Sequence, residues 1–370
     1  MRYTTCSFVL ALLITTPLVA APRRRATPPP PATPPCSVVT GTPAVTFSHD
    51  EGRTLAYVAE RLDGIGYTYG VAVLDTPNTI LSWFRNTLSI SADAGCSWRP
   101  LGDFTFDNPF PPRLAAARGG RAYAWSDNRA FLLRYRNGIP QVVKSPGELV
   151  GLGTDPNDGE HLRVASSDGV VWESRDGGDS WSRIATIGIS SSQLFYRFAF
   201  DPKDLDHIVA GTLVEGAYVT RDGGRNWQQA GGFGAKGQIN TFNLVISPVD
   251  GNVVWAMALD MSKVDEAPAH GKHIYRSGDG GVTYEPVVDQ GPDVTLINGP
   301  LLVAHPTDPD VVYFVFGTYF QAYGTDLFRY DWATKTLTNH HNDYDGVNAI
   351  DFSPDGRVMY LGLEVVRGHS

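Results

Sequence analysis

Ser174-Arg-Asp176-Gly-Gly178-Asp-Ser-Trp181 is one copy of an eight-residue pattern that occurs four times in this chain of 370 residues. The pattern reads Ser/Thr-x-Asp-x-Gly-x-x-aromatic, and we call its copies the octets; the others are Ser91–Trp98, Thr220–Trp227 and Ser277–Tyr284. Their aspartates are separated by 83, 46 and 57 residues. Repetition at roughly 40 to 50 residues is typical of propellers and related arrays, and the widest interval suits two units, one of which lacks an octet.

Each octet has the composition of a hairpin turn. The Asp side chain can accept hydrogen bonds from nearby backbone N–H groups, the Gly two positions later tolerates positive φ, and the final ring can be buried between sheets. Binding of a metal or acid catalysis by the aspartates is disfavoured, because each belongs to a complete turn in a different repeat. The residues assigned to these turns are Ser91, Asp93, Gly95, Trp98, Ser174, Asp176, Gly178, Trp181, Thr220, Asp222, Gly224, Trp227, Ser277, Asp279, Gly281 and Tyr284.

A second repeat has an apolar run, a turn that contains Pro, and another apolar run, which indicates two strands joined by a turn. Two earlier units follow the same plan without the Pro, one of them with strands near Ala44–Ser48 and Thr54–Glu60. Seven units result, beginning near residues 44, 113, 150, 196, 241, 299 and 347. The last unit has two clear strands, so we expect Cys36–Gly41 to supply its outer strand, because an open edge is a liability. The prediction is an all-β fold, a seven-bladed β-propeller whose ring is closed by an N-terminal strand.

The octets resemble the Asp-box of the sialidase-like β-propellers, although the last ends in Tyr284 rather than Trp. The resemblance implies that each box joins the third and fourth strands of a blade, on the face away from the usual ligand site. Asp-boxes occur in sialidases, xyloglucan-degrading enzymes, sortilin-type receptors and photosystem II assembly factors. The Arg-Ile-Pro motif of sialidases is absent from the sequence, so a non-sialidase member is expected. An assembly-factor role would need an Arg-rich patch, which the sequence does not reveal.

Composition and the N-terminal segment indicate an exported protein with one domain. Residues 1–21 have a basic start, an apolar stretch and small residues before a cleavage point, as in a signal peptide. Residues 22–35 are expected to form a Pro-rich disordered spacer, and residues 36–370 the propeller. The net charge of −9 argues against nucleic acid as a partner. We expect a secreted, periplasmic or extracellular monomer with no integral membrane segment after cleavage; the arginines of the spacer leave weak attraction to anionic lipid open.

Two cysteines, Cys36 and Cys96, remain after removal of the signal peptide. A disulfide is the expected state in an oxidising compartment, and the strand and turn assigned to them lie on adjacent blades. Two free thiols are the alternative. Two cysteines make a metal site improbable, and no metal or cofactor is expected.

Candidate ligand-binding residues lie on long connections at the face opposite the octets, since such loops carry function on a rigid scaffold. Four connections stand out: Arg61–Asn86, Asp260–Lys272, Thr318–Thr325 and His340–Asp345. Their aromatic rings could stack on a sugar or hold a peptide, or only cover the blades. His340 with Asp343 or Asp345 could bind a metal or transfer protons, or only be solvated. The candidates are Tyr67, Tyr69, Trp83, Arg85, Asp260, Glu266, Tyr319, Tyr323, His340, Asp343 and Asp345.

The function predicted from the sequence is a binding or scaffold module for an extracellular protein or glycan. The alternative is a carbohydrate-active enzyme, a glycoside hydrolase or lyase, with acids drawn from Asp260, Glu266, Asp343 or Asp345. Glycoside hydrolysis needs two facing carboxyl groups, and the sequence pairs none. The interpretation therefore favours a protein without catalytic activity and assigns no catalytic residue.

Overall fold

The computed structural model describes residues 34–41, 44–60, 68, 70–105, 112–188, 195–291, 294, 301–316, 325–342 and 346–364. All of them belong to one compact unit, Pro31–Ser370. Among these residues no helix is long and apolar enough to cross a membrane.

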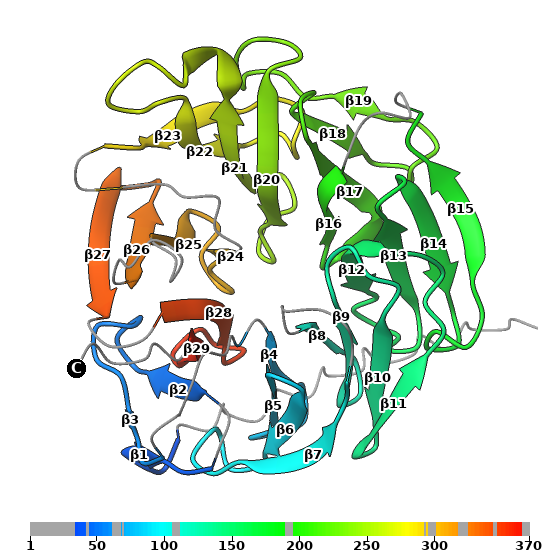
Figure 1. Ribbon diagram of the computed structural model, residues 1–370, viewed down its shortest axis with the longest axis vertical. Coiled ribbons are helices and arrows are strands. Elements are labelled where there is room, and N and C mark those ends of the chain that lie inside the picture. The colour runs from blue at the N-terminus through cyan, green and yellow to red at the C-terminus, as the bar shows by residue number, and fades with distance from the viewer. Residues whose placement is uncertain are drawn as a thin grey trace, which may run out of the picture. The chain divides into compact units, whose positions relative to one another are not determined.

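Seven antiparallel sheets form the blades of a propeller around a central axis (Figure 1). Six blades have four strands that are consecutive in the chain. Blade one is β4 (Gly70–Val73), β5 (Ile80–Phe84), β6 (Thr87–Ser91) and β7 (Arg99–Asp103); blade two is β8 (Arg113–Ala117), β9 (Arg121–Trp125), β10 (Leu132–Arg136) and β11 (Ile139–Val143). Blade three is β12 (Leu149–Thr154), β13 (Leu162–Ser166), β14 (Val170–Ser174) and β15 (Ser182–Thr186); blade four is β16 (Phe195–Asp201), β17 (Asp204–Thr212), β18 (Ala217–Thr220) and β19 (Gln228–Gln229). Blade five is β20 (Ile239–Ile246), β21 (Val254–Asp260), β22 (Lys272–Ser277) and β23 (Glu285–Asp289); blade six is β24 (Leu302–Ala304), β25 (Val311–Phe316), β26 (Thr325–Asp331) and β27 (Thr336–Asn342).

Blade seven combines the two ends of the described chain. Its sheet has the order β28 (Gly346–Phe352), β29 (Met359–Glu364) and β2 (Val45–Ser48), so an N-terminal strand closes the ring. The predicted segment is wrong, however, because Val45–Ser48 and not Cys36–Gly41 pairs with β29. The assignment of Ala44–Ser48 and Thr54–Glu60 to a first unit of their own is wrong, because β2 pairs with β29. β3 (Tyr57–Val58) runs beside β2, and β1 (Val38–Val39) pairs in parallel with β3 beyond it. The first blade instead begins at β4.

Apolar side chains fill the spaces between neighbouring blades. Trp255 of blade five is fully buried among residues of blade six, and its ring lies 6.2 Å from that of Tyr330. Glycines permit the closest approaches: a Cβ on Gly151 would lie 2.4 Å from the Phe198 carbonyl oxygen of the next blade. A larger residue there would push the two blades apart.

The octets form the turns between third and fourth strands. In Thr220–Trp227, the Thr220 hydroxyl accepts a hydrogen bond from Gly224 N at 3.0 Å, and Asp222 accepts one from Asn226 N at 2.9 Å. The same two bonds recur in the other three octets. They also recur in Ser48–Leu55, where Gly52 N donates to Ser48 and Thr54 N to Asp50. The sequence pattern misses this fifth turn because Leu55 stands where the other copies have a ring.

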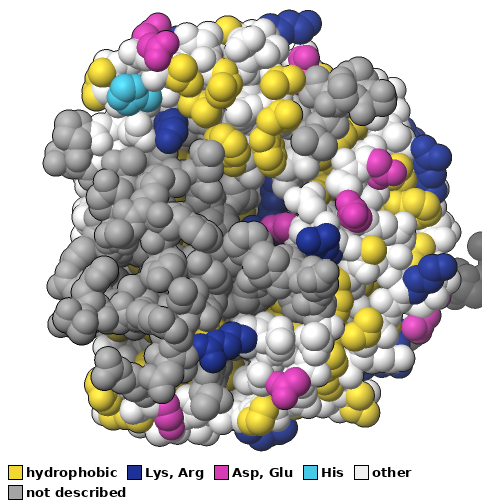
Figure 2. Space-filling model, in the orientation of Figure 1, with side chains coloured by type: hydrophobic (Ala, Val, Ile, Leu, Met, Phe, Trp, Pro, Cys, Tyr) yellow, Lys and Arg dark blue, Asp and Glu magenta, His cyan; other side chains and the backbone are white. Residues whose placement is uncertain are grey.

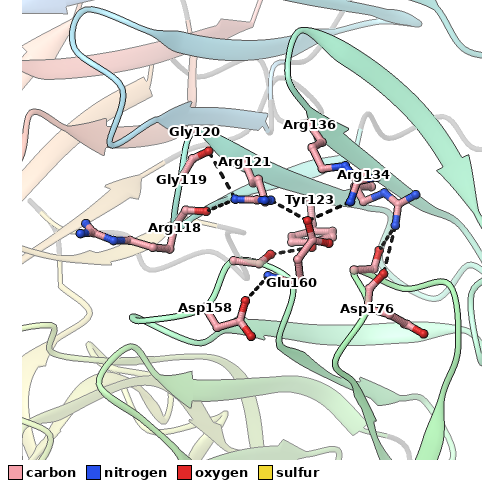
Figure 3. Close-up of polar contacts among 12 residues, drawn as sticks. Arg118, Gly119, Gly120, Arg121, Tyr123, Arg134, Arg136, Asp158, Glu160 and Asp176 are labelled. Carbon is pink, nitrogen blue, oxygen red and sulfur yellow. Dashed lines mark hydrogen bonds and ion pairs between the residues drawn. The ribbon is translucent and has the colours of Figure 1, made fainter.

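Charged side chains connect consecutive blades on the side of the octets. Glu160 of blade three accepts hydrogen bonds from Arg121 Nε at 2.7 Å and Arg136 Nη1 at 3.0 Å, both from blade two (Figure 3). Arg134, 4% exposed, reaches the carbonyl oxygens of Asp176 and Gly177 in the octet of blade three. Similar links join blades three to four, five to six, and six to seven, through Arg163–Asp206, Arg276–Asp310 and Arg329–Glu51.

The predicted disulfide between Cys36 and Cys96 is present, with Cα atoms 5.8 Å apart and a sequence separation of 60. It fastens the segment before β1 to the octet of blade one, where Thr40 N also donates to the Cys96 carbonyl oxygen at 2.9 Å. The bond therefore lies at the seam where blade seven meets blade one.

Replacing both cysteines by alanine should lower the free energy of unfolding, by at most about 4 kcal/mol, because a cross-link across about 60 residues restricts the unfolded chain. Urea unfolding of the variant measures the loss, and the reduced wild-type protein should give the same value. A variant as stable as the oxidised wild type would contradict this assignment of the bond to the closing seam.

Replacing Asp222 by Asn should lower the melting temperature of the protein at neutral pH but not near pH 2. Hydrogen bonds from Asn226 N, the Asn226 side chain and Thr220 lower the pKa of Asp222 to about 2, below the usual value of about 3.9. Its contribution to stability is therefore complete above about pH 4 and is lost as the pH falls toward 2.

Melting temperatures of wild type and variant, measured from pH 7 to pH 2, should accordingly converge in acid. Asp265→Asn is the matched control, since this exposed carboxylate lies outside the octets, and it should leave the melting curve unchanged. A constant difference between wild type and Asp222→Asn at every pH would refute the role of the carboxylate charge.

Candidate functional site

The strand order gives the ring two different faces. Octets join third to fourth strands and the Pro turns join first to second strands, so both kinds of turn lie on one face, which we call the turn face. The second-to-third loops and the connections between blades lie on the other, the loop face. Most gaps in the described chain, such as 106–111, 189–194 and 317–324, separate strand ends on the loop face.

The prediction that Arg61–Asn86 forms one long loop is wrong for the residues that the structure describes, 68 and 70–86. The range contains β4 and β5, and Trp83 lies in β5 with no exposed surface. Its indole N–H donates to the Arg85 carbonyl oxygen at 2.9 Å, and its ring packs against Phe104 at 5.4 Å. Trp83 is therefore a core residue between blades one and two, whereas Arg85 lies exposed at the β5–β6 turn on the loop face.

His340 is also buried rather than on a connecting loop. It lies in β27, is 1% exposed, and its Nδ1 donates to the Glu51 carbonyl oxygen at 2.5 Å. Burial lowers the pKa of His340, which keeps the imidazole neutral. It joins blade six to the octet-like turn of blade seven, and this position argues against both alternatives considered for it, a metal or proton-transfer role and a solvated side chain. The candidates Tyr67, Tyr69, Tyr319, Tyr323, Asp343 and Asp345 lie outside the described residues.

The structure gives Asp260 and Glu266 different positions: Asp260 is the last residue of β21, whereas Glu266 lies in the loop between β21 and β22. Asp260 is 1% exposed and caps the short 3₁₀ turn η1 (Met261–Lys263) by accepting a hydrogen bond from Ser262 N at 3.0 Å. Glu266 is exposed. The structure therefore does not present Asp260 to solvent as the acid that the enzymatic alternative would require, whereas a binding role for Glu266 stays a prediction.

Residues 261–271, which we call the 261–271 loop, are held by hydrogen bonds within the loop and by one to Gln238, which lies just before β20. Met261 N donates to the Gln238 carbonyl oxygen at 2.8 Å, His270 N to that of Glu266 at 2.8 Å, and His270 Nδ1 to that of Val264 at 2.8 Å. The loop exposes two aliphatic side chains, Met261 at 41% and Val264 at 37%. Figure 2 shows hydrophobic side chains gathered over this end of blade five. Aliphatic groups on a rigid support lose little entropy on binding, which suits a protein contact.

An arginine pair lies near the axis on the loop face. Arg113 of β8 and Arg197 of β16 both contact Asp127, at 2.6 Å and 3.4 Å, and so connect blade two to blade four. Burial and the neighbouring Arg113 lower the pKa of Arg197 to about 10. Although burial alone would raise the pKa of Asp127, Arg113 and Arg197 hold it below its usual range. Sequence analysis missed this cluster because its members are far apart in the chain and share no motif.

A half-buried carboxyl group lies at the seam of blades seven and one. Asp351 of β28 accepts hydrogen bonds from Val73 N at 2.7 Å and from Phe352 N at 2.8 Å. Burial nevertheless raises the pKa of Asp351 to about 6, because two backbone donors do not replace the lost hydration. Among the described residues no group of three or more His, Cys, Asp or Glu could hold a metal ion.

Comparison with known proteins identifies a relative along most of the chain. The chain is 46% identical over 343 residues to the dispase autolysis-inducing protein of Streptomyces mobaraensis, and the match covers 91% of this chain and 90% of that protein. No protein-family model matches. Among solved structures, YCF48 bound to D1 peptide has a TM-score of 0.55 at 14% identity, covering 84% of this chain and 96% of that one. The Cps50 (Swd1) β-propeller domain of Myceliophteria thermophila has a TM-score of 0.57 at 11% identity, covering 83% and 99%. At these identities the two structures support the fold alone.

Asp351 should make the protein more stable as the pH falls from about 6 to about 4. Its folded-state pKa of about 6 exceeds the usual value of about 3.9, so the folded protein binds the proton first. The gain is up to about 3 kcal/mol. It is measured as the difference in urea unfolding between wild type and Asp351→Asn at pH 4, 5, 6 and 7, since the difference cancels the other titrating groups. A difference independent of pH would show that Asp351 does not titrate in this range.

Proposed function

Because the chain belongs to the family of the dispase autolysis-inducing protein, we propose that it is an exported protein-binding propeller that binds a protease and promotes its self-digestion. Autolysis is self-digestion, so the partner in the relative's name is itself proteolytic. The observation that supports this proposal best is the alignment, which extends along 91% of the chain rather than over isolated octets. A binding module was also the function expected from the sequence.

The 261–271 loop is the surface that suits such a partner best among the described residues. Interfaces gain most of their energy from a few apolar anchors that become buried, and methionine adapts well to an irregular partner surface. Met261 and Val264 are exposed together on a loop whose backbone is already fixed. Glu266 lies beside them and supplies polar contacts at the rim. We assign these residues to the contact with the protease.

Export is part of the proposal. Residues 1–21 have the features of a signal peptide, residues 22–35 those of a spacer, and the disulfide favours an oxidising compartment. We also propose membership of the Asp-box superfamily without sialidase activity, on the basis of the four octets and the fifth turn at Ser48–Leu55. A glycan is the second candidate partner, for which the exposed Glu266 is the described candidate residue.

Adding this protein to purified dispase should accelerate the loss of intact dispase and the appearance of its fragments, measured by gel densitometry and mass spectrometry. The double variant Met261→Ser with Val264→Ser should need at least tenfold more protein for the same effect, because each removed anchor is worth about 1 kcal/mol or more.

The matched control is Ile139→Ser with Val142→Ser, which removes two aliphatic groups that are 67% and 54% exposed on β11, the edge strand of blade two. It should act like the wild type. If the wild-type protein left dispase unchanged, the partner would be wrong. If the wild type and the loop variant accelerated autolysis equally, the assignment of the contact surface to the 261–271 loop would be wrong.

A further inference from the structure

A pocket of about 350 Å³ opens at the axis on the turn face, opposite the 261–271 loop. It is surrounded by the ends of the first strands of blades one to four and by the turn after β28. Its walls are apolar, formed by residues such as Leu74, Ala116, Leu152 and Phe200. This volume lies in the range of small-ligand sites and is sufficient for one extended side chain.

Two carboxylates lie at the rim of the pocket, and backbone donors hold both in place. Asp75 accepts hydrogen bonds from Gly119 N at 2.8 Å and Gly120 N at 2.6 Å. Asp155 accepts them from Asn157 N at 2.7 Å, from Asp158 N at 3.2 Å and from His161 Nδ1 at 2.9 Å. Because a carboxylate offers about four acceptor positions, and Arg118 is the third donor to Asp75, each carboxylate retains one position for a further donor. The rim is therefore preorganised to receive a positive charge.

Two basic side chains contact the rim carboxylates: His161, which is held between Asp155 and Glu173, and the weakly held Arg118. Arg118 Nη1 lies 3.5 Å from Asp75, and the Arg118 side chain is 64% exposed. An exposed pair of this kind contributes little to stability, so another cation can displace Arg118 from Asp75. The octets add an aspartate each to the same face, and their hydrogen bonds keep them charged in mild acid.

We propose that the axial pocket binds a lysine side chain of a partner protein, with its four-carbon stem along the apolar walls and its ammonium group at Asp75 and Asp155. Lysine combines an apolar stem with a charged end, which is the combination that the walls and the rim require. The two carboxylates belong to different blades, so they suit a compact ammonium group with three donors better than the planar fork of arginine. The site is independent of the proposed protease contact, because it lies on the other face.

The test uses the propeller labelled with ¹⁵N and two small probes, N-acetyl-lysine methylamide and its norleucine counterpart, which has the same stem without the charge. The lysine probe should cause saturable shifts of the amide signals of Gly119, Gly120 and Thr154, while Gly271 on the loop face stays unchanged. The norleucine probe should bind at least tenfold more weakly. Equal binding of the two probes would show an apolar pocket without selection for charge and would overturn the proposal, as would tighter binding of the corresponding arginine probe.

Two variants change the affinity in opposite directions. Asp75→Asn should weaken binding of the lysine probe at least tenfold, read at Thr154, whereas Arg118→Gln should strengthen it about threefold because it removes the competing cation. Since Arg118 is exposed, that variant tests the proposal even if Asp75→Asn fails to fold.

Asp204→Asn is the matched control. It removes a carboxylate from the first turn of blade four, where Asp204 accepts a hydrogen bond from Asp206 N at 3.0 Å, without touching the pocket. The Asp204→Asn variant should bind the lysine probe with the same affinity as the wild type. An equal loss in Asp204→Asn and Asp75→Asn would assign the binding to the general charge of the face and refute the pocket.

Discussion

The pairing of β2 with β29 is the interaction on which the ring depends. The other blades are built from strands that follow one another in the chain, so each can form from local hairpins. Blade seven must bring Val45 beside Gly362, across most of the chain length. Closing so long a segment is entropically costly, although the cost rises only slowly with length. The seam offsets it with a continuous apolar cluster that includes Phe47, Tyr360 and Trp98, in addition to the disulfide.

The two faces of the ring differ in how firmly their parts are fixed. On the turn face, hydrogen bonds within the octets are combined with arginine links from one blade to the next, as between Arg163 and Asp206. Arg134 alone makes several of these links, because its guanidinium donates hydrogen bonds to two carbonyl oxygens and a carboxylate of the neighbouring blade. The loop face instead carries the long connections and the 261–271 loop. Contacts on the loop face can therefore vary without disturbing the bonds that define the blades.

Much of the fold could be predicted from the sequence because its signals are local. An octet contains its own donors, acceptors and glycine, so Ser174–Trp181 indicates its turn without reference to the rest of the chain. The seam could not be derived in this way. The sequence of β2 fits the first strand of a new blade as well as the closing strand of blade seven. Only its pairing with β29 decides between these two assignments. The turn at Ser48–Leu55 was missed for a related reason, because its backbone bonds need Ser, Asp and Gly but not the final ring.

Burial explains why the candidate site was predicted less well than the fold. Trp83 and His340 are residue types that occur at binding sites, but both are enclosed by packing against residues distant in sequence. The arginine pair of Arg113 and Arg197 meets only because two inner strands face the same axis. Met261 and Val264 are apolar residues of a kind that is usually buried. Only the conformation of their loop, which is held by hydrogen bonds, leaves them exposed. These features depend on three-dimensional proximity, which no single motif records.

The position of Cys36–Cys96 also determines how the molecule bears mechanical load. A pull on the chain before Cys36 reaches the covalent bond before it reaches β1 or β2, and passes into the octet turn of blade one. The short parallel pairing of β1 with β3 and the longer ladder of β2 with β29 are thereby shielded from peeling, residue by residue, from that end. A propeller of this design could be held by its N-terminal segment on a surface or in a matrix, and its ring would stay closed as long as the disulfide stays oxidised.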